Sequence, residues 1–306
     1  MPQSPTAVFM VRPTSFGFDS QTAESNAFQH TSSLTATEII NKADSEFQQA
    51  VSMLRSHGID VTLFEDSPTP PKPNAVFPNN WLSMWPSGQI YLYPMATESR
   101  RIERSSNALE LLKNKFEVTE IIDISKSELD GKYLESTGVL IFDHVAKIAY
   151  GCLSIRCDEQ LFNEHVKSLG YTPFVFHAVD ENNVPIYHTN VLMGVESTTA
   201  VVCFDAIKDE FEHSELERLL KQTGHEIVAI SHAQMNAFCG NVLELQNKNG
   251  EKFLALSQTA FDNFTNEQRE ILSRDKTLLP LAIPTIETIG GGSVRCMLAE
   301  VFLQPK

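Results

Sequence analysis

The residues best suited to chemistry lie near the C-terminus, where a thiol follows three consecutive glycines. The stretch is Gly290-Gly291-Gly292-Ser293-Val294-Arg295-Cys296, and an apolar run over residues 297–303 follows it. Consecutive glycines allow positive φ and a close approach by another group. The apolar run predicts a strand, so the turn would present the Cys296 thiol at the start of that strand. A nucleophile is one interpretation; the alternative is a small buried hydrophobe, as most free cysteines are.

Two further stretches place a titratable side chain before an apolar run. Tyr187-His188-Thr189-Asn190 precedes residues 191–193, and Leu134-Glu135-Ser136-Thr137-Gly138 precedes residues 139–142. A cysteine thiolate is a nucleophile, and a nearby imidazole can carry its proton. A carboxylate can orient that imidazole or bind a cationic substrate. The alternatives are a surface or capping histidine and an exposed carboxylate at a strand entry.

Composition and charge narrow the classes of partner. The chain has 306 residues and a formal net charge of -15, which argues against nucleic acid and against an anionic membrane surface. The N-terminus lacks the pattern of a secretory signal, and no apolar run is long enough to span a bilayer. We therefore expect a cytoplasmic protein. The sequence leaves open whether it forms a homo-oligomer.

The cysteines and glycines argue against a disulfide framework, a metal site and a nucleotide cofactor. The five cysteines are scattered along the chain, at 152, 157, 203, 239 and 296. An odd, scattered set in a large chain is typical of a reducing compartment. No CxxC or HExxH pair and no G-x-G-x-x-G fingerprint occurs. We expect no metal and no cofactor.

Short apolar runs alternate with amphipathic stretches along the whole chain, which predicts the α/β class. The Pro-rich stretch Asp66–Asn74 is interpreted as a crossing within one domain covering residues 1–306. We count about five ββαβ-like units. Strands are predicted at 7–11, 58–64, 90–94, 116–122, 139–142, 148–150, 173–177, 191–193, 199–204, 226–231, 242–245, 253–256 and 297–303, and helices at 35–54, 107–115, 158–169, 214–223 and 265–273.

Taken in order, these stretches resemble the motifs of the guanidino-group-modifying superfamily, the penteins. This superfamily includes arginine deiminase, dimethylarginine dimethylaminohydrolase and the amidinotransferases. Its Gly-Gly stretch with a basic residue before Cys is matched at 291–296, and its Leu-Glu-Gly-Gly-Asp motif at 134–138. Its His-x-Asp, Ser-x-Arg and Phe-x-x-Asp motifs are matched by His188-Thr189-Asn190, Ser154-Ile155-Arg156 and Phe77-Pro78-Asn79-Asn80. The chain is most similar to the arginine deiminase-related or citrulline-utilising branch.

The resemblance implies a single pentein catalytic domain, a five-bladed α/β propeller with the site at its centre. It implies a small-molecule amino-acid substrate and no cofactor. Cys296, His188 and Glu135 would be catalytic, and Arg156 would hold the substrate carboxylate. Asn80 and Asn190 would contact the guanidino or ureido group, and the stretch ending in Asn241 would form another pocket wall. The alternatives for these residues are turn-forming asparagines and a solvated arginine at a strand end.

The chain departs from the family pattern at three positions. Asn80 and Asn190 stand where the family has aspartate, and Gly138 stands where a further Asp is frequent. A guanidinium carries a permanent charge, whereas an amide side chain offers one donor group and one acceptor without charge. The replacements therefore favour citrulline, or another neutral ureido compound, over arginine. Against this, Glu135 remains and could balance a guanidinium alone.

The predicted function is hydrolysis of a C–N bond in arginine metabolism through a covalent Cys296 intermediate. Citrulline giving ornithine, ammonia and carbon dioxide is favoured. An arginine deiminase or dihydrolase, a dimethylarginine-type hydrolase and an amidinotransferase are the alternatives. A non-enzymatic binding module would be expected to lack Cys296 or His188. Whether residues 15–29 fold over the site stays open.

Overall fold

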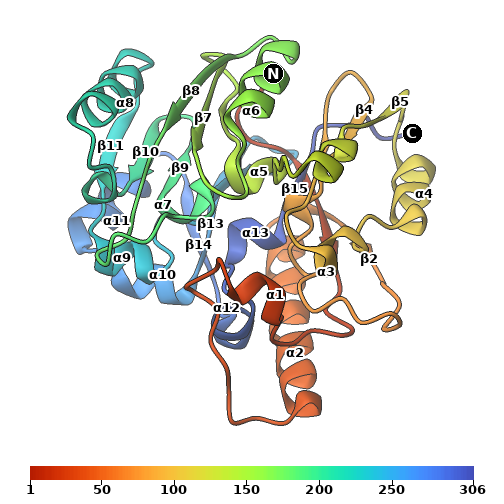
Figure 1. Ribbon diagram of the computed structural model, residues 1–306. Helices are drawn as coiled ribbons and strands as arrows, with labels where there is room; N and C mark the ends of the chain where they lie inside the picture. Colours follow the sequence, from red (N-terminus) through yellow and green to blue (C-terminus); the bar gives the residue numbers. More distant parts are fainter.

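The computed structural model describes residues 1–306 and contains helices and strands throughout (Figure 1). No helix is both long enough and apolar enough to cross a membrane. The strands are β1 (Ala7–Val11), β2 (Asp60–Phe64), β3 (Leu82–Met84), β4 (Gln89–Leu92), β5 (Glu120–Asp123), β6 (Ile141–Asp143), β7 (Ile148–Cys152), β8 (Thr172–Phe176), β9 (Met193–Val195), β10 (Thr199–Val202), β11 (Glu226–Ala229), β12 (Leu243–Gln246), β13 (Lys252–Ser257), β14 (Thr277–Leu281) and β15 (Ala299–Val301).

The strands pair in five units of the same kind. In each unit an inner strand pairs antiparallel with a middle strand, and the middle strand pairs parallel with an outer strand. The units are β15-β1-β2, β3-β4-β5, β6-β7-β8, β9-β10-β11 and β12-β13-β14, and the first two join into one six-stranded sheet. The α/β class predicted from the sequence is confirmed.

Each parallel pair needs a crossover, and helices supply it. The crossover helices, in chain order, are α2 (Ala36–Ser56), α3 (Glu98–Arg101) with α4 (Ser106–Lys115), α6 (Glu159–Ser168), α8 (Glu210–Gln222), and α10 (Gln258–Asn263) with α11 (Asn266–Leu272). The longest, α2, begins with a capping box between Thr35 and Glu38. Its apolar face buries Ile39, Ala43, Phe47, Ala50, Val51 and Leu54.

The two ends of the chain meet in the first unit. Strand β1 near the N-terminus pairs with β15 near the C-terminus, with Ala7 opposite Val301. All five residues of β1 are buried, which fits an uninterrupted apolar run. The pairing anchors the segment that follows Cys296 to the N-terminal strand.

Three predicted strands that follow chemically important residues begin later than expected. Helical turns come first: α5 (Ser136–Val139) after Glu135, α7 (Thr189–Leu192) after His188, and α13 (Val294–Met297), which contains Cys296. The glycines before Cys296 therefore precede a helical turn, not a strand. Apolar periodicity over four residues does not distinguish a buried turn from a strand, and this is why the prediction was wrong here.

Other boundaries differ for local reasons. The strand predicted at 116–122 is β5, which begins only at Glu120. Strand β14 and helix α12 (Pro284–Gly290) were not predicted. Pro280 within β14 and Pro284 at the start of α12 made this stretch resemble a loop. Three more helices are α1 (Ser20–Ala23), α9 (His232–Asn236) and the 3₁₀ turn η1 (Pro78–Asn80), which precedes β3.

Two neighbouring residues of α2 test its packing against the core. Leu54 is fully buried, whereas Met53 is 42% exposed. We expect Leu54→Ala to lower the free energy of unfolding by about 2–5 kcal/mol, because the substitution leaves a cavity. Met53→Ala should change it by roughly 0.5 kcal/mol or less. Urea unfolding measures both; equal losses would contradict the assigned helix face.

Candidate active site

Short turns from four units converge at the start of their inner strands. Helix α13 contacts η1, η1 contacts α5, and α5 contacts α7. In Figure 1, α13 lies near the middle of the molecule. The turns border a small cavity of about 20 Å³, lined by Thr22, Asn26, Asn74, Phe77, Asn80, Arg100, Arg156, Tyr187, His188, Gly290, Gly291, Gly292 and Cys296. Four of the predicted site residues, Asn80, Arg156, His188 and Cys296, thus share one cavity.

Glu135 is fully buried beside the cavity and contacts two of these side chains. Its Oε2 lies 2.7 Å from His188 Nε2 and 3.4 Å from Arg156 Nη1, and its Oε1 accepts from Ala96 N at 3.0 Å. Burial alone would raise the pKa of this carboxyl, but the charge of Arg156, the His188 hydrogen bond and the charge of Arg100 hold the pKa well below its usual range. Glu135 is therefore ionised at neutral pH.

The ionised carboxylate determines which nitrogen of His188 can exchange a proton. A carboxylate only accepts, so Nε2 must carry the hydrogen, and Nδ1 of the neutral ring has a free lone pair. Burial lowers the pKa of His188 to about 4 despite the hydrogen bond to Glu135, and the charges of Arg156 and Arg100 add to this lowering. Nδ1 lies close to Gly138, 3.0 Å from where a Cβ would stand. His188 is thus a neutral base with Nδ1 available.

Two asparagine amides donate to the thiol. Cys296 Sγ accepts from Asn190 Nδ2 at 3.4 Å and from Asn241 Nδ2 at 3.3 Å. Asn241 is itself held by the backbone, since its Nδ2 donates to Asn190 O at 2.9 Å and its Oδ1 accepts from Arg295 N at 3.0 Å. Donors aimed at the sulfur favour the thiolate, which is the nucleophilic form. The predicted pocket-wall residue Asn241 thus contacts the thiol directly.

The other four cysteines lack this setting. Burial raises the pKa of the Cys152, Cys203 and Cys239 thiols to about 12, 11 and 12, and raises that of Cys157 well above its usual value. All five cysteines are free. These four thiols accordingly lack the thiolate character that a nucleophile needs. No group of side chains is arranged to hold a metal ion.

The glycine stretch is required by close contacts on both sides. Gly291 has φ +63°, and a Cβ there would lie 2.6 Å from Asn26 Nδ2. Its carbonyl accepts from Tyr187 Oη at 2.7 Å and from Asn26 Nδ2 at 3.1 Å. A Cβ on Gly290 or Gly292 would lie 2.7–3.0 Å from the ring of Phe77. A larger residue in this stretch would displace the wall of the cavity next to Cys296.

Asn80 presents a donor to the site. Arg100 Nη1 lies 2.6 Å from Asn80 Oδ1, and because a guanidinium only donates, this contact fixes the orientation of the amide. Asn80 Nδ2 is buried without a partner. A Cβ at Gly138 would lie 2.4 Å from this nitrogen, so the third departure from the family pattern leaves room for Asn80.

Asn190 presents an acceptor beside the thiol. Its Nδ2 faces the carbonyl oxygen of Thr137 at 3.4 Å as well as the Cys296 sulfur, and this orients the amide. Its Oδ1 is buried without a partner. Asn80 and Asn190 therefore contribute one unpaired donor and one unpaired acceptor on two oriented amides, and buried polar groups of this kind ordinarily have partners.

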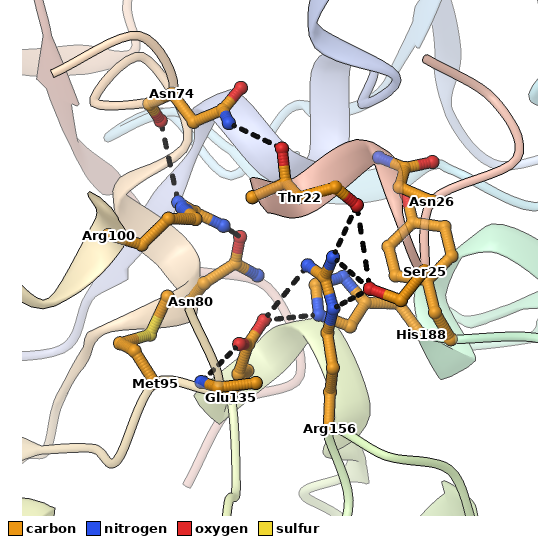
Figure 2. Close-up of polar contacts among 12 residues, drawn as sticks. Thr22, Ser25, Asn26, Asn74, Asn80, Met95, Arg100, Glu135, Arg156 and His188 are labelled. Atoms are coloured by element: carbon orange, nitrogen blue, oxygen red, sulfur yellow. Dashed lines mark hydrogen bonds and ion pairs between the residues drawn. The ribbon is translucent and has the colours of Figure 1, made fainter. Parts of the chain in front are cut away.

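Arg156 links the Glu135 carboxylate to the N-terminal segment, as Figure 2 shows. Besides Glu135 it contacts Thr22 O at 3.2 Å and Ser25 Oγ at 2.7 Å through Nη2. Its guanidinium lies 4.9 Å from the ring centroid of Tyr187. Helix α1 and the residues after it thus lie over Arg156, and Thr22 and Asn26 of this segment line the cavity.

Several cavity residues were not predicted. Arg100 is buried and pairs with Glu103 at 2.8 Å, yet in the sequence it belongs to a charged run that resembles a solvated helix. Asn74 ends a Pro-rich loop, where asparagine is common for local reasons. Thr22 and Asn26 lie far from every motif along the chain. No sequence signal separates these residues from ordinary surface positions.

The Asn241 contact can be tested on the thiol itself. We expect Asn241→Leu to slow iodoacetamide alkylation of Cys296 at neutral pH by about tenfold or more, because a hydrogen bond to a charged group contributes roughly 1.5–3 kcal/mol. Peptide mass spectrometry measures the rate at this cysteine. Asn236→Leu, at an exposed position nearby, serves as the control. An unchanged rate in folded Asn241→Leu protein would contradict the assigned contact.

Comparison with solved structures shows the fold. One similar structure is the N-terminal domain of ArgZ, an arginine dihydrolase from cyanobacteria, solved as a cysteine-to-serine mutant bound to substrate. The comparison gives a TM-score of 0.74 and 13% sequence identity, and it covers 97% of this chain and 99% of that chain. DDAH from Pseudomonas aeruginosa, solved with citrulline, has TM-score 0.65 and 13% identity over 97% and 99%. A mutant of AgrE bound to L-arginine has TM-score 0.75 and 14% identity, covering 96% of this chain.

The chain spans only 41% of the ArgZ chain in its apo structure and 40% of the AgrE chain. A search of curated proteins found no match. A sequence model of a family described as eukaryotic N,N-dimethylarginine dimethylhydrolases matches residues 12–303. The chain therefore belongs to this dimethylarginine dimethylhydrolase family, and the predicted membership of the guanidino-group-modifying, or pentein, superfamily is confirmed.

Proposed function

We propose that this chain is a single catalytic domain, with its five units arranged as propeller blades, which hydrolyses the ureido group of citrulline to give ornithine, ammonia and carbon dioxide. The observation that carries this proposal is the pair of oriented amides, with Asn80 Nδ2 and Asn190 Oδ1 unpaired. We propose a location in the cytoplasm; the five free cysteines support it.

A ureido group complements this pair better than a guanidinium does. Its carbonyl oxygen can accept from Asn80, and its N–H groups can donate to Asn190. A guanidinium has only donors, so it would face Asn80 Nδ2 without forming a bond, close to the buried charge of Arg100. Glu135 offers little compensation, because His188 and Arg156 already engage it. A neutral ureido group forms the hydrogen bond with Asn80 and places no second positive charge next to Arg100.

The geometry supports a two-step mechanism. The Cys296 thiolate attacks the ureido carbon, and Asn80 Nδ2 donates to the oxygen on which negative charge develops. His188, having taken the thiol proton on Nδ1, gives it to the leaving δ-nitrogen; ornithine departs and a carbamoyl group stays on sulfur. His188 then deprotonates a water that attacks this thioester-like carbon. The C–S bond breaks and the proton on His188 returns to the Cys296 sulfur. The released carbamic acid decomposes to ammonia and carbon dioxide.

Polar groups along the cavity can hold the amino-acid end of the substrate. Arg156 is a buried guanidinium suited to a carboxylate. Asn74 Nδ2 donates to Asp19 and Thr22, which leaves its buried Oδ1 unpaired as an acceptor for an α-ammonium group. Relatives of the same fold were solved with L-arginine and with citrulline, which supports a free amino acid as the substrate class.

The comparisons favour a second candidate, an arginine dihydrolase or a dimethylarginine hydrolase. The family model is described by dimethylarginine hydrolysis, and ArgZ by arginine dihydrolysis. An amidinotransferase would use the same residues and differ only in passing the group to an amine. Dimethylation removes both hydrogens from the terminal nitrogen, so such a substrate could not donate to Asn190 Oδ1 from that position.

A product assay with citrulline, arginine and asymmetric dimethylarginine side by side tests the proposal. We expect ornithine and ammonia in equal amounts from citrulline, and no reaction in Cys296→Ser, which lacks the nucleophile. Citrulline left untouched while arginine or dimethylarginine is consumed would overturn the proposed substrate. Product formation that requires an added amine would indicate a transferase.

Asn80→Asp tests the amide pair. A carboxylate at this position cannot donate to the ureido oxygen, so we expect kcat/KM for citrulline to fall about 100-fold or more, within the range measured for lost oxyanion donors. Asn236→Asp, which adds the same charge at an exposed site, should leave kcat/KM unchanged. Full citrulline activity in Asn80→Asp would refute the assigned role of the donor.

A further inference from the structure

One oxygen atom serves both a catalytic base and a buried cation. Glu135 Oε2 lies 2.7 Å from His188 Nε2 and 3.4 Å from Arg156 Nη1, and Figure 2 draws both contacts as dashed lines from the carboxylate. The three side chains are all buried, at 0%, 2% and 1% exposure for Glu135, His188 and Arg156. Because bulk water does not screen them, a change of charge at Arg156 is felt at His188.

The charged groups facing His188 come from three elements. Glu135 precedes α5, Arg156 follows β7, and Arg100 belongs to α3; Cys296 in α13 and Tyr187 are the other titratable groups on this cavity. Arg100 has a carboxylate of its own, because Glu103 accepts from its Nε and Nη2 at 2.9 and 2.8 Å. Arg156 has only Glu135, which it shares with His188.

The remaining donors of Arg156 are bound by weak, neutral partners. Nε and Nη2 contact the hydroxyl of Ser25, and Nη2 also contacts the carbonyl of Thr22. A carboxylate entering the cavity can replace these contacts with charge-assisted hydrogen bonds. It would also compensate the charge of Arg156, and Glu135 would then be left to His188.

The proposed reaction requires that His188 take up a proton. In the free protein His188 is neutral, because burial and the two guanidiniums disfavour the imidazolium. Each covalent step passes through an imidazolium, first when His188 takes the thiol proton and again when it deprotonates the attacking water. With a neutral ureido group at the reacting end, the substrate supplies no cation there. Its carboxylate is the negative charge that can offset Arg156.

We propose that Arg156 is a positioning residue which couples binding of the substrate carboxylate to proton uptake by His188. An empty cavity then keeps His188 neutral, so this base takes up a proton readily only when an amino acid is bound. This inference extends the proposed function but depends only on an anionic group reaching Arg156, not on which group is hydrolysed.

A titration without turnover tests the coupling. Cys296→Ala protein labelled with ¹⁵N-histidine is titrated by NMR, with norvaline, which has the carboxylate but no ureido or guanidino group, and with butylamine, which lacks the carboxylate. We expect norvaline to raise the pKa of His188 by about one unit or more, a tenfold change in proton affinity. Butylamine should not raise it. His144 and His165, buried outside the cavity, are internal controls.

Two results would overturn the coupling: norvaline binding that leaves the His188 titration unchanged, or norvaline failing to bind at all. Arg156→Met supplies a second check, because its ligand-free form should already show the raised His188 pKa, with no further rise on adding norvaline. Since norvaline cannot be hydrolysed, these outcomes stand apart from failure of the proposed citrulline activity.

Turnover gives an independent readout. N-carbamoylputrescine has the ureido group of citrulline without the carboxylate, and agmatine stands in the same relation to arginine. Whichever headgroup reacts, we expect the decarboxylated partner to lose at least about tenfold in kcat, and added formate to restore part of it. A loss confined to KM would mean that the carboxylate contributes binding only, and would contradict the coupling.

Discussion

A buried carboxylate, Glu135, holds the site together. An isolated carboxylate at full burial is strongly unfavourable, and it persists here because Arg156 and His188 share one of its oxygens while a backbone amide binds the other. That compensation determines the tautomer of His188. It also places a guanidinium next to the cavity, where a substrate carboxylate can reach it. In the proposed function, the acid–base chemistry and the recognition of an amino acid thus depend on the same charge.

The fold supplies this arrangement by repetition. Asn80, Glu135, His188 and Cys296 each lie in or directly before a short turn that leads into the inner strand of its unit. Such a turn allows a polar side chain to point towards the cavity, whereas the inner strand that follows the turn stays apolar and buried. The amides of Asn190 and Asn241 then meet the thiol from neighbouring units. Substitution of amide for carboxylate changes the charge of such a centre without changing its architecture.

The sequence predicted the elements that show a regular apolar spacing and the site residues that belong to motifs in a known order. Strand β1 and helix α2 followed from an apolar run and from helical spacing, and the grouping of Cys296 with His188 followed from the order of motifs. The contact between Glu135 and Arg156 was not predicted, because Arg156 was assigned to the substrate carboxylate. The turns before the inner strands were read as strands, because four apolar or small residues carry no distinguishing period. Arg100 could not be predicted, since its burial depends on contacts with residues 74–80 that only the folded chain creates.

In the proposed mechanism, Cys296 carries a carbamoyl group after ornithine has departed. Mixing the protein with citrulline, quenching in acid within one turnover and measuring the mass of the peptide containing Cys296 tests this directly. We expect an increase by one carbamoyl group on that cysteine, absent in His188→Ala, where the leaving nitrogen has no proton donor. An adduct that retains the whole amino acid, formed with arginine and not with citrulline, would refute the carbamoyl intermediate and identify loss of ammonia as the first step.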